Sequence, residues 1–154
     1  MKKTIAILMA VVLASAACPV CFAQGEGEPL TFAVASDLHY NPPGEELVRL
    51  SDDPVYWYAN RRAAMEEESG FIIDEFLGQC AADEAIQYVL ISGDLADDGR
   101  FYQEDHEAVA QKLRDFETRT GKDVFVINGN HDAADDCATT YDDFKRIYAE
   151  FGYD

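Results

Sequence analysis

The stretch "VINGNHDAADD", residues 126–136, decides how the fold is interpreted. An apolar run at residues 124–127 is typical of a buried strand and stops abruptly. Polar groups follow at once, with an amide at Asn130, an imidazole at His131 and a carboxylate at Asp132. This abrupt change predicts that a buried strand ends in a loop that carries chemistry.

Two further apolar runs resemble this one. Buried strands are predicted over residues 30–35, 88–91 and 124–127. Helical spacing of apolar residues predicts helices over residues 53–79, over residues 104–118 and from residue 140 onward. The alternation predicts an α/β fold with a parallel sheet and right-handed crossovers. Because the strands are apolar without alternation, the sheet is expected to be covered on both faces.

Local signals mark where these helices begin, bend and end. Gly70 is expected to break or bend the first helix, and Gly121 to end the second. Thr140, with Asp143 three residues later, is expected to begin the third helix in the manner of a capping box.

Each predicted strand runs directly into polar residues. The first is followed by residues 36–39, the second by residues 92–94 and the third by residues 129–132. Glycines at Gly93 and Gly129 would let the backbone turn sharply before a polar residue. In a parallel sheet the carboxyl ends of the strands lie at one edge, where open α/β folds bind ligands. Residues far apart in the sequence are therefore expected to meet there.

The side chains predicted at this edge are of the kinds that bind divalent cations. Asp37 and His39 are two residues apart, so in an extended segment their side chains would point the same way. Asp94 has two carboxylate oxygens and would be able to bridge two cations, and Asn130 supplies a neutral amide oxygen. Carboxylate, imidazole and amide ligands without a thiolate favour Mn, Fe, Zn or Co.

The DxH block at residues 37–39, the GD block at 93–94 and the GNHD block at 129–132 together resemble the calcineurin-like metallophosphoesterase family. The resemblance covers roughly residues 30–154. A GD pair alone carries almost no information, but three blocks in family order, each at a predicted strand end, form a specific pattern. The resemblance implies the βαβαβα N-terminal half of a metallophosphoesterase-type β-sandwich flanked by helices. That sandwich is incomplete in this sequence, because the partner strands of its second sheet are not found.

The resemblance also implies two divalent metal ions as cofactors. Asp37 and His39 would bind the first ion, Asp94 would bridge both, and Asn130 would bind the second. A hydroxide held between the ions would attack phosphorus in line, because two cations lower the pKa of a bound water and neutralise charge on phosphorus. The implied function is hydrolysis of phosphomonoesters or phosphodiesters without a phospho-enzyme intermediate.

Two further roles follow from the resemblance. His131 would lie near the phosphate, as the acid to the leaving group or as a stabiliser of the transition state. Asp132 would orient the imidazole ring of His131.

The sequence departs from the family pattern after the GNHD block. The family continues with a lone histidine and a GHxH block, which complete both metal shells. This sequence has three histidines, and His106 precedes the GNHD block, so it is out of order for either role and is expected to be structural. We therefore expect the N-terminal part of a longer enzyme. The alternative is a truncated or degenerate module that binds a metal or a partner without turnover.

A second departure concerns the residue three positions after the bridging aspartate. Purple acid phosphatases, which resemble this family, carry tyrosine there, whereas this sequence has Asp97. A tyrosine-ligated ferric site is therefore not expected. Asp97, with Asp98 and Gly99, is expected to shape a loop, and binding of a further ion is the alternative.

The N-terminus has the pattern of an export signal. Two lysines precede an apolar run that is too short to span a bilayer comfortably. Residues 1–23 are interpreted as a cleaved signal peptide, residues 24–29 as a tether and residues 30–154 as the metallophosphoesterase domain. The expected location is secreted, periplasmic or at the cell surface. Residues 15–18 loosely resemble a lipobox, so lipid anchoring through Cys18 is the alternative.

The charge of the chain limits its partners. The formal net charge is −18, and removal of residues 1–23 would remove two lysines and no acidic residue, leaving −20. This field would repel nucleic acid, so nucleic-acid binding is not expected. The expected partner is a small phosphorylated substrate, and no transmembrane span is expected after signal removal. An exported protein permits a disulfide, so a Cys80–Cys137 bridge is left open.

Overall fold

The computed structural model describes residues 29–42 and 68–153. The predicted signal peptide at residues 1–23 and the predicted helix start at Asp53 lie outside the described residues. Among the described residues, no helix has the length and apolar character needed to cross a membrane.

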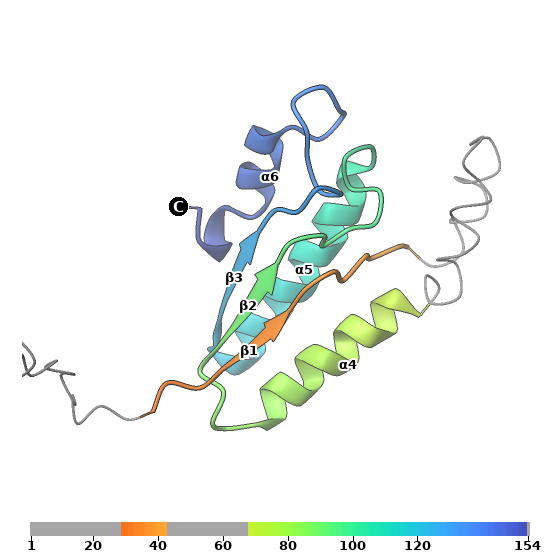
Figure 1. Cartoon of the computed structure of the whole chain (residues 1–154). Helices are drawn as coiled ribbons and strands as arrows, with labels where there is room; N and C mark the ends of the chain where they lie inside the picture. Colours follow the sequence, from red (N-terminus) through yellow and green to blue (C-terminus); the bar gives the residue numbers. More distant parts are fainter. Residues whose placement is uncertain (1–28, 43–67, 154) are drawn as a thin grey trace, which may run out of the picture.

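Three parallel strands form the sheet that the sequence predicted. They are β1 (Phe32–Ala35), β2 (Tyr88–Ser92) and β3 (Asp123–Ile127), arranged in the order β1-β2-β3 (Figure 1). β1 pairs with β2 and β2 pairs with β3, both in parallel. The predicted α/β class and parallel sheet are therefore confirmed.

Three helices follow the strands in alternation. They are α4 (Ser69–Ala82), α5 (Gln103–Thr120) and α6 (Tyr141–Ile147), and a 3-10 turn, η1 (Ala149–Phe151), follows α6. α4 ends three residues beyond the predicted end at residue 79, and α5 is longer than predicted at both ends.

The predicted helix signals have different outcomes. Gly121 follows α5 in the left-handed conformation with φ 69°, which glycine adopts without steric cost. Thr140 and Asp143 form the predicted capping box at the start of α6, with reciprocal side-chain to backbone hydrogen bonds. Gly70 lies in the first turn of α4, which begins at Ser69, and the residues before Glu68 are outside the described part of the chain, so the expected break or bend at Gly70 stays a prediction.

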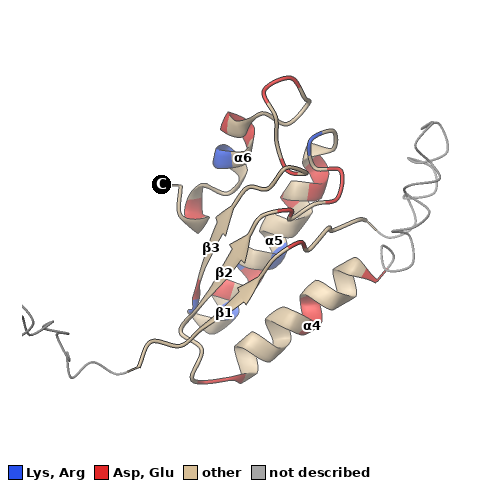
Figure 2. Cartoon of the chain, viewed as in Figure 1, with Lys and Arg blue, Asp and Glu red and all other residues tan. Residues whose placement is uncertain are grey.

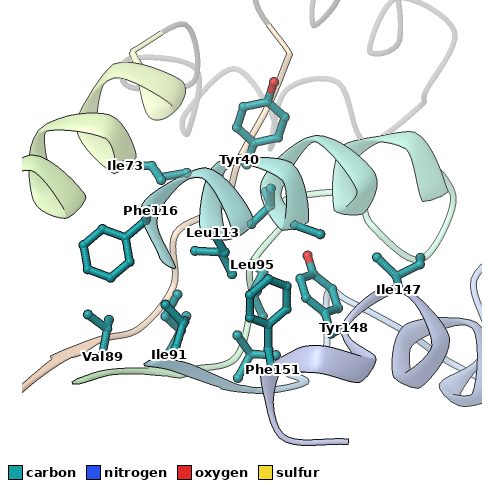
Figure 3. Close-up of a cluster of buried hydrophobic side chains, with 14 of the residues drawn as sticks. Tyr40, Ile73, Val89, Ile91, Leu95, Leu113, Phe116, Ile147, Tyr148 and Phe151 are labelled. Carbon is teal, nitrogen blue, oxygen red and sulfur yellow. The ribbon is translucent and has the colours of Figure 1, made fainter. Parts of the chain in front are cut away.

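The helices gather on one face of the sheet. Val89 and Ile91 point to that face, where Leu113 and Phe116 of α5 pack against them (Figure 3). Val126 of β3 is buried in the same cluster. Ile73 and Leu77 of α4 and Tyr148 and Phe151 near the C-terminal end join the same buried cluster. Complete burial of each large apolar side chain contributes about 1.5–3 kcal/mol, so this single core holds the sheet and the helices together.

The opposite face of the sheet corrects the prediction of cover on both sides. Phe32, Val34, Phe125 and Ile127 are 43%, 58%, 42% and 58% exposed among the described residues. The physical reason is the strand order. Strands added in one direction with crossovers of one hand place α4 and α5 on the same face. Apolar residues along a strand therefore do not show whether helices cover one face of the sheet or both.

Cys80 and Cys137 are both free thiols in the structure, so the disulfide left open by the sequence is not formed. Cys80 is buried near the C-terminal end of α4, where Lys122 donates to its carbonyl oxygen at 2.7 Å and to that of Asp83 at 2.7 Å. Lys122 directly precedes β3, so Cys80 lies at the amino edge of the sheet. Cys137 follows the carboxyl end of β3 and therefore lies at the other edge.

Thr140→Ala tests the energetic contribution of the capping box. The substitution removes the hydroxyl that accepts from the Asp143 N–H at 3.2 Å, and loss of such a cap costs about 1 kcal/mol. Urea unfolding should show this loss. Thr118→Ala, an exposed position inside α5, is the matched control and should change stability by less than about 0.5 kcal/mol. Equal losses in the two variants would mean that the cap does not stabilise the fold.

Candidate metal centre

Parallel pairing continues past the ends of β1 and β2 and draws two polar segments together. The N–H of Asp37 donates to the carbonyl oxygen of Gly93 at 3.1 Å, and the N–H of His39 donates to that of Asp94 at 3.0 Å. Figure 2 shows acidic residues in the segments that leave the sheet after each strand. The expected convergence at the carboxyl edge is therefore present as a continuous backbone feature.

Three of the predicted metal ligands lie close together at this edge. His39 Nε2 is 3.8 Å from Asp37 Oδ1 and 3.9 Å from Asp94 Oδ2. One ligand atom from each residue lies within 4.8 Å of the other two. Carboxylate and imidazole ligands bind a divalent cation at about 2.0–2.2 Å, so atoms with this spacing are able to share one. The donor set therefore fits a divalent cation.

The backbone at these three residues differs from the extended segment that the sequence predicted. Asp37, His39 and Asp94 have φ values of 56°, 42° and 51°, in the left-handed region. Each such residue costs about 1–2 kcal/mol relative to the right-handed region. Asp37 and His39 therefore converge through two left-handed residues, and the prediction of a simple extended alternation was wrong. Strain of this kind gathers at functional sites because the surrounding structure must maintain it.

Asp97 contacts both histidines of the site and was not predicted to do so. Its carboxylate Oδ1 is 2.7 Å from His39 Nδ1, within ion-pair distance, and Nε2 of the same ring faces Asp37 and Asp94. A carboxylate behind a ligating imidazole fixes the ring and raises its basicity. Asp97 follows Asp94 by three residues, and this short spacing is the sequence feature that indicates a place in the same loop.

The backbone of Asp97 also positions His131. The Asp97 carbonyl oxygen is 2.7 Å from His131 Nδ1, and a carbonyl only accepts, so Nδ1 carries the proton. The His39 and His131 rings meet edge to face with centroids 4.9 Å apart. His39, Asp97 and His131 also form a second group with ligand atoms within 4.8 Å of one another. Asp97 therefore links the DxH block to the GNHD block.

Asp132 does not orient His131, contrary to the prediction. Its side chain is fully buried, and its carboxylate accepts three backbone N–H groups, from Leu95 at 2.8 Å, Ala96 at 3.2 Å and Gly129 at 2.7 Å. Burial raises the pKa of Asp132, and these hydrogen bonds oppose the rise. The difference arises because the Asp132 side chain lies in the core, whereas the His131 ring contacts the Asp97 carbonyl oxygen and the His39 ring. Asp132 therefore ties the loop after β2 to the loop after β3.

The other two predicted site residues lie on the loop after β3. The N–H of His131 donates to Asp94 Oδ1 at 2.9 Å. This bond connects the loop directly to the group of predicted ligands Asp37, His39 and Asp94, called the ligand cluster below. Asn130 is exposed and lies between His131 and Gly129. Its role as a ligand of a second cation stays a prediction.

Gly129 is required for space, and its φ is not positive. A Cβ at this position would lie 2.2 Å from Asp94 Oδ1 and 2.5 Å from the Asp94 backbone N. Gly93 does have the expected left-handed conformation, with φ 94°, and a Cβ there would lie 2.8 Å from the Gly129 backbone N. The two glycines therefore let the loops after β2 and β3 touch.

Gly129→Ala should displace Asp94 and reduce cation affinity. Forcing an extra carbon into such a contact costs about 1–3 kcal/mol, so we expect a lower melting temperature and at least a tenfold weaker Mn²⁺ affinity in calorimetric titration. Gly78→Ala is the control, because a Cβ at that helical position meets nothing within 4 Å. Unchanged Mn²⁺ affinity in Gly129→Ala would contradict the close approach described above.

Asp97→Asn should weaken cation binding without removing the backbone carbonyl that contacts His131. The substitution replaces the carboxylate behind His39 by a neutral amide, and loss of such a partner costs about 10–100-fold in metal affinity. The measurement is the Mn²⁺ dissociation constant. Asp135→Asn, an exposed acid of the loop after β3, removes the same charge and should bind Mn²⁺ like the parent. A loss of the same size in both variants would assign the effect to net charge alone.

Comparison with known proteins agrees with this arrangement at the level of the family. Neither curated proteins nor solved structures give a match to this chain. A family model described as calcineurin-like phosphoesterase matches residues 30–154, which include all three strands and every residue of the ligand cluster. The chain therefore belongs to the calcineurin-like phosphoesterase family.

Proposed function

We propose that the protein is an exported phosphoesterase that uses two divalent cations to hydrolyse phosphomonoesters or phosphodiesters by direct attack of water. The observation that carries the proposal is the meeting of Asp37, His39 and Asp94 at the carboxyl edge of the sheet, in a chain of the calcineurin-like phosphoesterase family. Export is supported by the sequence pattern of residues 1–23.

The chain supplies suitable groups for the cations. Asp37 and His39 would hold the first and Asp94 would be shared with the second, which Asn130 would complete. When bound, the cations would lower the pKa of a coordinated water and neutralise negative charge that develops on phosphorus. The ligands available from this sequence favour Mn, Fe, Zn or Co.

His131 is the residue that we assign to proton transfer. Its Nδ1 proton is held by the Asp97 carbonyl oxygen at 2.7 Å, so Nε2 is the nitrogen left to exchange a proton with a substrate. In the protonated ring Nε2 would donate to the leaving-group oxygen as the ester bond to phosphorus breaks. The edge-to-face contact with His39 keeps this ring beside the ligand cluster.

The acidic charge of the chain shapes which substrates are able to bind. A formal net charge of −18 disfavours a phosphate ester at the surface. Two divalent cations at the carboxyl edge would reverse the sign of the local field. Binding of the substrate is therefore expected to depend on prior loading of the cations.

The second candidate is a module that binds a cation or a partner without turnover. The supporting observation is that the three histidines of the sequence are His39, His106 and His131, while His106 is buried behind the site. Asp94 and Asn130 then remain as the predicted ligands of the second cation. The two candidates differ in hydrolysis and agree in cation binding.

Asp94→Asn tests the proposed function. The full-length protein should hydrolyse p-nitrophenyl phosphate or bis-p-nitrophenyl phosphate with Mn²⁺ present and lose this activity with EDTA. Because Asp94 is the shared ligand, we expect the substitution to lower kcat/KM by about 100-fold or more. Asp142→Asn, at an exposed position of α6, is the matched control and should keep the activity of the parent. Equal hydrolysis by the parent and by Asp94→Asn would reject the phosphoesterase site, and binding of Mn²⁺ without hydrolysis would favour the second candidate.

A further inference from the structure

We propose that His106 and Tyr148 are positioning residues for the metal centre, and that they act by fixing the main chain at Asp132. The proposal rests on the proposed function. It assigns a role to two buried polar side chains that lie outside the ligand cluster and that the chemistry described above does not use.

The three residues form a buried chain of hydrogen bonds that crosses the core. His106 Nε2 lies 2.8 Å from the carbonyl oxygen of Asp132, and His106 Nδ1 lies 3.1 Å from the hydroxyl oxygen of Tyr148. All three side chains are 0% exposed. His106 belongs to α5, and Tyr148 follows α6. The chain therefore anchors the loop after β3 to two helices.

The positions of the protons follow from the chemistry of the partners. The carbonyl of Asp132 only accepts, so Nε2 of His106 carries the ring proton and donates it. Nδ1 pairs with the Tyr148 hydroxyl, which also donates to the His106 carbonyl oxygen at 3.2 Å. Burial lowers the pKa of His106, which favours the neutral ring, and the Asp132 carboxylate, whose Oδ1 lies 3.9 Å from Nε2, opposes this shift.

The carbonyl that His106 holds belongs to the residue that joins the metal-ligating loops. The Asp132 carboxylate accepts from Leu95 and Ala96, directly after Asp94, and from Gly129. A shift of the main chain at Asp132 would therefore move Asp94 relative to the loop after β3. His106 and Tyr148 fix that main chain from behind, so a change at either is expected to reach the ligand cluster.

The space around His106 is matched to its ring. A Cβ at Gly99 would lie 2.1 Å from His106 Nε2 and 2.7 Å from its Cε1. Gly99 lies in the loop that follows Asp94, so this loop rests directly on the imidazole. The Gly99→Ala substitution would displace the ring without removing any polar group.

Packing alone does not account for polar side chains at these positions. Burying a histidine and a tyrosine costs free energy that apolar residues of similar volume would not cost, unless each polar atom has a partner. The hydrogen bonds of His106 supply those partners, and one of them ends on the loop that joins the ligands. A directional contact of this kind fixes position to a degree that apolar packing does not.

The experiment measures Mn²⁺ affinity in the full-length protein by calorimetric titration, at a temperature where each variant is shown by circular dichroism to be folded. Tyr148→Phe removes the hydroxyl and keeps the ring, and we expect affinity to fall at least threefold. Gly99→Ala should lower it at least tenfold. Tyr141→Phe, on the exposed side of α6, and Gly78→Ala in α4 are the matched controls and should bind like the parent. Amide hydrogen exchange at Leu95, Ala96 and Gly129 should be faster in the two test variants.

The outcomes separate the two proposals. Folded Tyr148→Phe and Gly99→Ala proteins that keep the Mn²⁺ affinity and amide protection of the parent would overturn the positioning role, even if their melting temperatures fall. A parent that binds Mn²⁺ but hydrolyses no ester would overturn the phosphoesterase function and leave the positioning role supported by the affinity differences. A parent without Mn²⁺ affinity would overturn both.

Discussion

Parallel pairing of three neighbouring strands is the constraint on which the rest of the structure depends. Because of this pairing, all three strands end at the same edge of the sheet. The pairing continues beyond β1 and β2 through backbone hydrogen bonds from Asp37 and His39. The contacts of the site are consequences of this pairing. The Asp132 carboxylate reaches the loop after β2 because β2 and β3 are neighbours, and Asp97 reaches both histidines because its loop lies between them.

The site combines residues in a strained backbone conformation with hydrogen bonds and close contacts that hold them in place. Three of the predicted ligands, Asp37, His39 and Asp94, hold left-handed φ values, and such conformations persist only where surrounding contacts outweigh their cost. The contacts come from two directions. Asp97 contacts His39 and His131 from the loop after β2, while Asp132 binds three N–H groups from within the core. The geometry of the predicted ligands is therefore supported by Asp97 and Asp132, which are not among them.

The sequence predicts the elements well and the site in part. Apolar runs and helical spacing report burial, so the strands, the end of α5 at Gly121 and the capping box at Thr140 all followed from residues close together in the chain. Strand order does not appear in such patterns, and it is strand order that leaves Phe32 and Ile127 exposed. The family blocks placed Asp37, His39 and Asp94 together. The left-handed turns, the contacts of Asp97 and the inward direction of Asp132 depend on pairing between distant segments, which no local pattern contains.

The contact of Lys122 with the end of α4 has a consequence for how this protein tolerates change. Its ammonium group binds carbonyl oxygens at Cys80 and Asp83, at the amino edge of the sheet. The ligand cluster occupies the other edge, a full strand length away. The Lys122 contacts are therefore far from the predicted ligands. A loop insertion at the amino edge, or a substitution of this lysine, is therefore expected to change the stability of the fold while the geometry of the predicted site is kept.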